Sequence, residues 1–387
     1  MNNTLLTNLI IVGVFIVYGV INYFIGRTCW EYLFSYIPHL NEKVFWLLFW
    51  FVAWSYILLK LLNRYLPHGI NSLLSWVGGF WLSILFYLSL LLLGILLIKL
   101  LNSYFNFLPP ALQNPHGVTV GLLIVLGLLL ACGLWNARNI ERVPYDVVIN
   151  KEAGNFEELK IVLVADLHLD HINNKRRLEK IVAKINESEP DLVLLAGDLV
   201  DTDLNYFKEQ QMDKTLQKIQ SKYGVYGVPG NHEYYNSADI NDLMSAIEGG
   251  NVKMLRDEYV KVQDSFYIVG RDDLTVGQMH GAGRKNLSSL MKDFDKKLPI
   301  ILIDHQPLFL KESQENGVDL HLSGHTHGGQ LFPNHLITQR MFEIDRGHLI
   351  KDKLHVIVTS GVNTWGPVIR LGTKAEIINI KVTFNKQ

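Results

Sequence analysis

Five short polar clusters contain residue types that bind metal ions, and each follows an apolar stretch. They are ADLHLD at 165–170, GDLVD at 197–201, PGNHE at 229–233, DHQP at 304–307 and SGHTHGGQ at 323–330. Their side chains offer carboxylate, imidazole and carboxamide donors without a thiolate, a set that suits Mn²⁺, Fe or Zn²⁺. In Asp-x-His and His-x-His, alternate residues of an extended chain lie on one face, so both can reach one site. The clusters therefore predict a metal centre.

Such a donor set points to phosphoester chemistry. One carboxylate bridging two cations would hold them about 3.5–4 Å apart, the separation used for in-line displacement at phosphorus. A water bridging the two ions would have its pKa lowered from about 15.7 toward about 7, which makes it an attacking hydroxide. Both cysteines, Cys29 and Cys132, precede the clusters, and no Ser or Cys nucleophile is required. We therefore expect hydrolysis without a covalent intermediate.

The segments that must position these clusters are predicted to form an α/β domain. Short runs of Val, Ile and Leu alternate with charged stretches whose apolar residues recur with the period of a helix. Buried strands are predicted at 160–165, 192–196, 224–228, 300–303 and 320–322, and the tail from Leu354 is predicted to be β structure. Helices are predicted at 175–188 and 207–219. Ligand sites in open α/β sheets gather outside the carboxyl ends of strands. The five clusters can therefore converge on one pocket.

The order of the clusters resembles that of the calcineurin-like metallophosphoesterase superfamily. The matching blocks are Asp-x-His, Gly-Asp-x-x-Asp, Gly-Asn-His-Glu, His and Gly-His-x-His, over residues 166–327. The Gly-Gly-Gln extension at 328–330 and SGVNTWGPVIRLG at 360–372 resemble one bacterial branch of membrane-associated phosphodiesterases. Some members of that branch are related to enzymes that cleave the pyrophosphate of UDP-diacylglucosamine. The resemblance implies a β-sandwich flanked by helices.

The resemblance also implies a role for each matching residue. The first metal ion would be held by Asp166, His168, Asp198 and His327. Asp198 would bridge to a second ion, completed by Asn231, His305 and His325. His232 would stabilise the transition state or donate a proton beside the scissile phosphate, with Asp201 orienting it and Glu233 behind the ligands. The cofactor would be two divalent ions, Mn²⁺ first, with Fe or Zn²⁺ as alternatives.

Several polar or aromatic residues outside the five blocks have an open interpretation. His171 could line the pocket or lie on the surface, and His321 is expected within a strand rather than as a ligand. Asp272 and Asp273 end a strand and are ambiguous. Trp365 could clamp a substrate, although a lone aromatic is more often core. The run Lys175–Arg177 is expected to be a solvated helix face, with a lipid-phosphate clamp as the alternative.

Charge is distributed very unevenly along the chain of 387 residues. Residues 1–143 carry seven Lys and Arg and three Asp and Glu, against 29 and 34 in residues 144–387. Four apolar runs, Leu5–Ile25, Val44–Leu62, Phe80–Ile98 and Val118–Trp135, are long enough to cross a bilayer, which takes about 20 helical residues. We therefore expect a membrane region at 1–137, a linker at 138–156 and a metallophosphoesterase domain at 157–387.

The distribution of positive charge gives a prediction of topology. Four spans place the N-terminus and the catalytic domain on the same side of the cell membrane. Five Lys and Arg near the spans lie on that side and three on the other, which favours a cytoplasmic catalytic domain. The net charge of −1 and the acidic balance of residues 144–387 argue against a nucleic-acid partner.

The leading functional hypothesis is a membrane-anchored binuclear hydrolase of a phosphodiester or pyrophosphate, with a lipid or nucleotide-lipid as the candidate substrate. The alternatives are a phosphomonoesterase of the same superfamily, or a membrane scaffold or sensor with an inactive hydrolase domain. The complete set of candidate ligands argues against an inactive domain.

Overall fold

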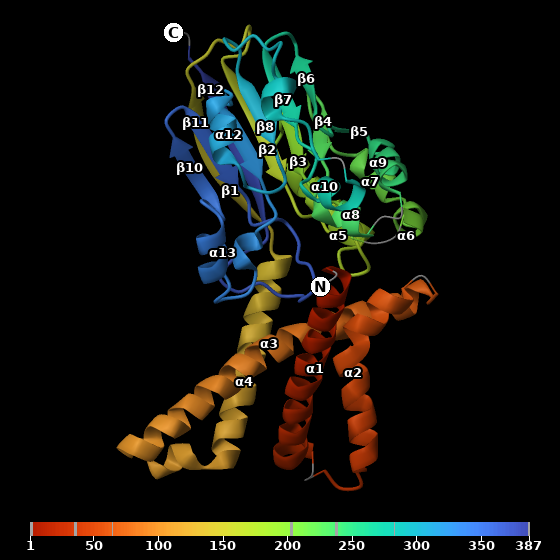
Figure 1. The fold of residues 1–387 in the computed structure, drawn as a ribbon, viewed down its shortest axis with the longest axis vertical. Helices are drawn as coiled ribbons and strands as arrows, with labels where there is room; N and C mark the ends of the chain where they lie inside the picture. Colours follow the sequence, from red (N-terminus) through yellow and green to blue (C-terminus); the bar gives the residue numbers. More distant parts are fainter. Residues whose placement is uncertain are drawn as a thin grey trace. The chain divides into compact units, whose positions relative to one another are not determined.

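Four long helices form the N-terminal part of the chain in the computed structural model (Figure 1). The structure describes residues 3–385, except 35–36, 64, 202–203, 237–238 and 282. The helices are α1 (Asn3–Cys29), α2 (Glu42–Leu62), α3 (His68–Phe105) and α4 (Pro115–Arg138), with short turns η1 (Trp30–Phe34) and η2 (Pro110–Gln113). All four are long and apolar enough to cross a membrane, as the sequence predicts. Helix α3 starts 12 residues before the predicted Phe80, at His68.

Small residues and one buried polar pair hold these helices together. A Cβ at Gly78 of α3 would lie 2.7 Å from the backbone nitrogen of Tyr56 in α2, so this approach requires glycine. Trp81 of α3 donates from Nε1 to Oδ1 of Asn22 in α1 at 3.0 Å. Helix contacts of this kind replace the hydrophobic effect where lipid surrounds the helices.

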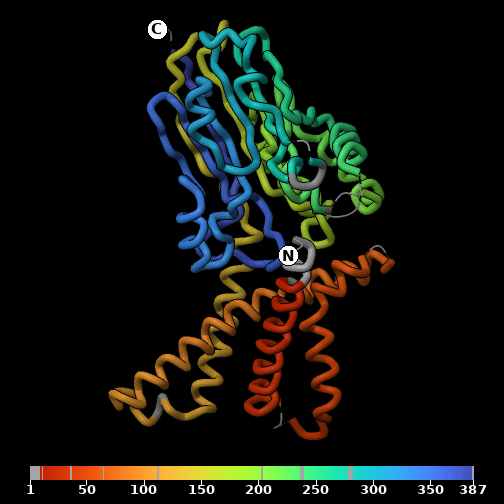
Figure 2. The backbone as a smooth tube through the Cα atoms, in the orientation of Figure 1, coloured from red at the N-terminus to blue at the C-terminus, as the bar shows by residue number. Residues whose placement is uncertain are grey.

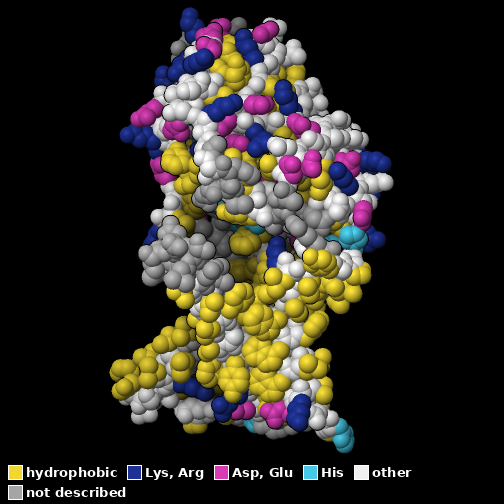
Figure 3. Space-filling view, turned by 45° about the vertical axis from the view of Figure 1, so that its right-hand side comes forward, with side chains coloured by type: hydrophobic (Ala, Val, Ile, Leu, Met, Phe, Trp, Pro, Cys, Tyr) yellow, Lys and Arg dark blue, Asp and Glu magenta, His cyan; other side chains and the backbone are white. Residues whose placement is uncertain are grey.

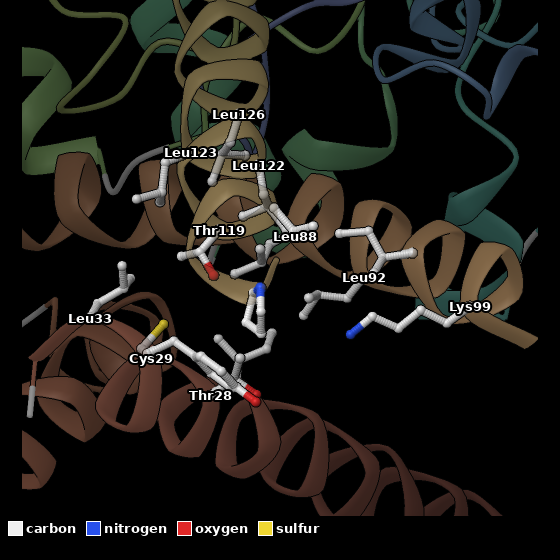
Figure 4. A pocket seen from close by; sticks show the side chains of 15 residues that line it. Thr28, Cys29, Leu33, Leu88, Leu92, Lys99, Thr119, Leu122, Leu123 and Leu126 are labelled. Atoms are coloured by element: carbon white, nitrogen blue, oxygen red, sulfur yellow. The ribbon is translucent and has the colours of Figure 1, made fainter. Parts of the chain in front are cut away.

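A cavity of about 150 Å³ lies between α1, α3 and α4 (Figure 4). Its walls are mainly aliphatic, with Leu88, Leu92 and Leu122 among the lining residues, while Lys99 and Thr119 add polar groups. On the face shown in Figure 3, hydrophobic side chains cover most of the helical part, with charged side chains at its lower end, whereas charged side chains are spread over the rest. The two surfaces are those expected for lipid and for water.

Two six-stranded sheets form the second part of the chain. The first sheet has the order β1-β12-β2-β3-β4-β5, and the second has the order β10-β11-β9-β8-β7-β6. The strands of the first sheet are β1 (Glu141–Ile149), β2 (Glu158–Val164), β3 (Leu192–Ala196), β4 (Val225–Val228), β5 (Val252–Met254) and β12 (Glu376–Phe384). Those of the second sheet are β6 (Glu258–Val262), β7 (Phe266–Gly270), β8 (Ile300–Ile303), β9 (Leu320–Ser323), β10 (Gly347–Lys351) and β11 (Leu354–Val358).

The hydrophobic core lies between the sheets and beneath the helices on their outer faces. Leu163 and Leu194 of the first sheet are buried in one cluster with Ile301 and Leu322 of the second. The helices of this part are α5 (Lys175–Asn186), α6 (Leu204–Glu209), α7 (Met212–Leu216), α8 (Asn231–Asn236), α9 (Ile240–Glu248), α10 (Thr275–His280), α11 (Leu287–Leu290), α12 (Leu310–Glu315), η3 (His327–Gly329) and α13 (His335–Met341). Helices α5, α7 and α9 pack on the first sheet, and α11 and α12 on the second. The predicted β-sandwich flanked by helices is confirmed.

Within the segment 138–156, predicted as a linker, residues 141–149 instead form a strand of the first sheet. Strand β1 pairs in parallel with β12, in register from Glu141–Glu376 to Ile149–Phe384 (Figures 1 and 2). The last seven residues of α4, from Cys132 to Arg138, also belong to the same compact unit as the sheets. Only Asn139 and Ile140 separate α4 from β1. The linker expected at 138–156 is therefore corrected to a strand at 141–149.

A second difference concerns the helix predicted at 207–219. The structure has two short helices here, α6 and α7, divided at Gln211. Gln211 has a φ of 52°, in the left-handed region, and a helix cannot continue through such a residue. The predicted strands before the polar clusters all match β2, β3, β4, β8 and β9 within one or two residues.

Candidate metal centre

The predicted ligands lie together because each follows the carboxyl end of a strand in a parallel arrangement. Strands β2, β3 and β4 are parallel neighbours in the first sheet, and β8 and β9 are parallel neighbours in the second. Their ends meet at one edge of the sandwich. The turns are tight: Asp198 has a φ of 52°, and a Cβ at Gly230 would lie 2.2 Å from its Oδ1. Glycine is therefore required at position 230.

One group of donors is formed by Asp166, His168 and His327. The Nε2 atoms of His168 and His327 are 3.1 Å apart, and Nε2 of His327 is 3.4 Å from Oδ1 of Asp166. All three side chains are buried. An oxygen and two imidazole nitrogens this close together could hold one metal ion.

A second group of donors is centred on His305. Its Nε2 lies 3.2 Å from Oδ1 of Asn231 and 3.2 Å from Nδ1 of His325. The same nitrogen is 3.1 Å from Oδ2 of Asp198. Asp198, His305 and His325 could hold a metal ion, with the Asn231 carboxamide beside them.

Asp198 lies between the two groups. Its Oδ2 is 3.1 Å from Nε2 of His305 and 3.8 Å from Nε2 of His168, so one oxygen faces both. Burial by itself would raise the pKa of Asp198, but the charges and hydrogen bond of the surrounding histidines hold that pKa below its usual value. An ionised carboxylate in this position has the geometry expected of a bridge between two cations.

Two of the candidate imidazole ligands are oriented by a contact of Nδ1, the ring nitrogen that faces away from the donor group. Nδ1 of His305 donates to the carbonyl of Ala196 at 2.8 Å, and Nδ1 of His168 lies 2.9 Å from Oδ1 of Asp201. A hydrogen held on Nδ1 leaves the Nε2 lone pair free to bind a metal. The carboxylate, carboxamide and imidazole donors therefore fit a pair of divalent cations.

His327 has a different partner. Nη2 of Arg370 donates to its Nδ1 at 3.1 Å, and a guanidinium group can only donate. This contact favours a neutral imidazole with its hydrogen on Nε2, the nitrogen that faces Asp166. Metal binding through Nε2 would require that hydrogen to leave, which makes His327 less well prepared as a ligand than His168 or His305.

His232 lies on the more accessible side of the donor groups, with 16% of its side chain exposed. Its Nδ1 is 2.7 Å from Oδ1 of Asp201, and its Nε2 is 4.0 Å from Oδ2 of Asp198. Burial by itself would lower the pKa of His232, but the charge and hydrogen bond of Asp201 raise it above the usual value. The protonated form of the imidazole is therefore favoured beside the donor groups.

Asp201 contacts two imidazoles with the same oxygen, since Oδ1 lies 2.9 Å from His168 and 2.7 Å from His232. Burial by itself would raise its pKa, but the two histidines hold the pKa well below its usual value. The predicted orienting contact to His232 is present. The contact to His168 was not predicted from the sequence.

Glu233 lies behind the donors, as predicted. Its carboxyl group accepts backbone N–H groups of residues 198, 199, 200 and 230, at 2.6–3.1 Å. Burial and the nearby charge of Asp198 raise its pKa to about 7. Glu233 therefore holds together the two turns that carry Asp198 and Asn231.

The ambiguous polar residues lie outside the donor groups. His321 is buried in β9 between Ser313 and Ser323, as expected. His171 is also buried, with its ring centroid 4.0 Å from that of Tyr206, so the surface alternative is wrong. Asp272 accepts a hydrogen bond from Tyr234, and Asp273 accepts one from Gln306 at 3.0 Å.

Two other residues differ from the favoured interpretation of the sequence. Trp365 is half-exposed rather than core, with its ring centroid 5.6 Å from that of His232. Arg177 is only 5% exposed and donates to four groups, so it is neither a solvated face nor a phosphate clamp. Because Lys175 and Arg176 precede it, the sequence predicted a solvated helix face and not a buried Arg177.

Comparison with known proteins agrees with this arrangement. The sequence profile of the calcineurin-like phosphoesterase family matches residues 159–329. A zebrafish (Danio rerio) protein described as a transmembrane protein with metallophosphoesterase domain is 28% identical, over 92% of this chain and 84% of its own. An uncharacterized metallophosphoesterase of Campylobacter jejuni is 31% identical over 68% of this chain and 69% of its own. A second uncharacterized metallophosphoesterase, from Aquifex aeolicus, is 31% identical over 58% of this chain and 85% of its own. With this donor set and these relatives, the chain belongs to the calcineurin-like metallophosphoesterases, the metal-dependent hydrolases of phosphoric esters.

Proposed function

We propose that the protein is a binuclear metallohydrolase that cleaves a phosphodiester or pyrophosphate bond of a lipid or nucleotide-lipid. The observation that carries the proposal is the position of Asp198, whose Oδ2 faces both donor groups. The ligands of the first ion are Asp166, His168, Asp198 and His327. Those of the second ion are Asp198, Asn231, His305 and His325. Mn²⁺ fits a set of only oxygen and imidazole donors.

Two bound cations would supply an activated water and neutralise charge on the phosphate. The protein's own side chains hold the donors and move a proton. His232, held by Asp201, is placed to donate a hydrogen bond or a proton to the departing oxygen. The charge and hydrogen bond of Asp201 raise the pKa of His232, which favours the protonated imidazole that a proton donor requires.

Aromatic and apolar side chains beside the centre favour a diester with an apolar substituent over a phosphomonoester. The rings of Trp365 and Tyr235 lie 5.6 Å and 6.4 Å from that of His232, and both side chains are partly exposed. Helix α13 begins against Gly329, two residues after His327, and exposes Ile337 among other apolar side chains. Apolar groups exposed on one short helix suit a lipid chain.

The four apolar helices support a substrate in the membrane. Four apolar helices precede a catalytic domain that starts two residues after α4. The excess of Lys and Arg on the side of the catalytic domain favours a cytoplasmic site at the cell membrane. The UDP-diacylglucosamine branch suggests a nucleotide-lipid pyrophosphate as the first substrate to try.

The choice between diester and monoester is tested with the full-length protein in detergent. We expect Mn²⁺-dependent hydrolysis of bis-p-nitrophenyl phosphate to exceed that of p-nitrophenyl phosphate. Faster hydrolysis of the monoester would favour a phosphomonoesterase. Absence of both activities with a folded, metal-loaded protein would favour a scaffold role.

The lipid part of the proposal is tested by a pair of matched substitutions. Ile337→Ser on α13 and Ile350→Ser on β10 change the same side chain at the same exposure of 58%. We expect Ile337→Ser to lower kcat/KM for a lipid-linked pyrophosphate in mixed micelles by about fivefold, the effect of losing part of one buried apolar side chain. Hydrolysis of the soluble diester should not change. Equal effects of the two substitutions would show that α13 does not contribute to recognition of the lipid.

A further inference from the structure

A loop at 360–373 supports the backbone that carries the first predicted ligand. The N–H of Val362 donates to the carbonyl of Ala165 at 3.1 Å, and the N–H of Asn363 donates to that of Asp166 at 3.2 Å. The carboxamide of Asn363 donates to the carbonyl of Leu167 at 2.6 Å. Asp166 has a φ of 58°, which an L-residue other than glycine rarely adopts. The loop therefore helps to hold this backbone conformation.

Arg177 joins this loop to the end of helix α4. Its Nε donates to Oδ1 of Asn363 at 2.8 Å, and its Nη2 donates to the carbonyl of Val362 at 3.0 Å. On its other side it donates to the carbonyls of Ala137 at 3.1 Å and Arg138 at 2.7 Å. The last carbonyls of a helix have no partner within the helix and carry a partial negative charge. The buried guanidinium group thus satisfies the end of α4 and the loop at once.

The far end of the loop contacts α4 one turn earlier. The N–H of Arg370 donates to the carbonyl of Gly133 at 2.9 Å, and the carboxamide of Asn136 donates to the carbonyl of Arg370 at 3.3 Å. A Cβ at Gly133 would lie 2.9 Å from Cβ of Ile369, which leaves no room for a side chain. Both ends of the loop are therefore held by the last two turns of α4, which belong to the same compact unit.

We propose that Arg177 is a positioning residue of the metal centre, which uses the C-terminal turns of α4 as the support for the loop behind Asp166. The inference rests on the proposed function, in which Asp166 binds the first ion but not the second. Loosening the loop should therefore weaken one ion selectively. The last turns of α4, up to Arg138, therefore support the metal centre. A protein that begins at β1 would lack this support.

The test measures Mn²⁺ binding to the full-length protein in detergent micelles, by equilibrium dialysis and elemental analysis over a range of free Mn²⁺. For Arg177→Gln we expect the affinity for one of two ions to fall by about 10–100-fold, the usual effect of losing a group that orients a ligand. The other ion should bind as in the parent. Hydrolysis of bis-p-nitrophenyl phosphate should fall at low Mn²⁺ and recover at high Mn²⁺. A general loss of folding would not be rescued in this way.

A milder pair of substitutions on α4 provides the matched control. Gly133→Ala introduces a methyl group against Ile369, whereas a Cβ at Gly127 of the same helix meets nothing within 4 Å. We expect Gly133→Ala to weaken the same ion as Arg177→Gln, and Gly127→Ala to stay within twofold of the parent. If Arg177→Gln does not fold, Gly133→Ala decides alone.

If folded Gly133→Ala binds both Mn²⁺ ions as tightly as the parent does, the inference is wrong. It is also wrong if the variant loses both ions equally. A parent that binds no Mn²⁺, or that turns over without metal, would instead overturn the proposed function. That outcome is visible before any variant is made, so the two failures are distinguishable.

Discussion

Asp198→Asn is expected to remove both metal ions and to lower kcat for bis-p-nitrophenyl phosphate by at least about 10³-fold, the scale of losing one preorganised electrostatic contribution. The reason is the shared oxygen: Oδ2 of Asp198 faces His305 in one donor group and His168 in the other. Asparagine keeps the size of the side chain and can still accept the N–H of His232 at Oδ1. It removes the negative charge that offsets two dications.

The control is Asp264→Asn, the same substitution at a residue whose side chain is 94% exposed. The φ of Asp264 is 53°, close to the 52° of Asp198, so the two positions place the same demand on the backbone. Asp264→Asn should leave metal content and kcat unchanged. Retention of one tightly bound ion in Asp198→Asn would show that Asp198 does not serve both sites.

His232→Ala is expected to lower kcat by about 10²–10⁴-fold, the usual range for general acid–base help, without loss of metal. The side chain of His232 meets Asp201 at 2.7 Å, whereas its bond to Asp198 comes from the backbone N–H, which alanine keeps. The charge and hydrogen bond of Asp201 raise the pKa of His232 against the effect of burial, which favours the protonated form that the proposed proton donor requires. His348→Ala, in the half-buried pair with His355 on β10 and β11, is the matched control.

Asp201→Asn separates the two contacts of Asp201. It should lower kcat less than His232→Ala does, by about 10–100-fold, and it should also reduce metal content because Nδ1 of His168 loses its charged partner. Parallel loss of metal and activity in His232→Ala would contradict the assignment, since His232 would then be a ligand or a structural residue.

The location of the candidate site could be predicted because it depends on a local rule repeated five times. Asp166, Asp198 and Asn231 each follow a run of apolar residues, and parallel strands bring such positions to the same edge of a sheet. The gathering of these side chains therefore needs no knowledge of long-range packing. The order of the blocks then identified the family.

Strand β1 and Arg177 could not be predicted, because both depend on partners that are distant in sequence. Strand β1 contains Pro144, which is typical of an edge strand or a loop, and its pairing partner β12 begins at Glu376. Arg177 is buried because carbonyls of residues 137, 138 and 362 surround it. Next to Lys175 and Arg176, an arginine in a helical pattern is typical of a solvated face. Only the fold reveals that its charge is used internally.

In the proposed function, two metal ions are required for hydrolysis of a phosphoric diester, and they are bound by Asp166, His168, Asp198, Asn231, His305, His325 and His327. This requirement is tested most directly by removing divalent metal from the full-length protein with a chelator, adding back Mn²⁺ in steps, and measuring bound Mn²⁺ and hydrolysis of bis-p-nitrophenyl phosphate together. The account predicts no activity without metal, and recovery that is complete only as the second ion per chain is bound. Full turnover with one ion or none would contradict it.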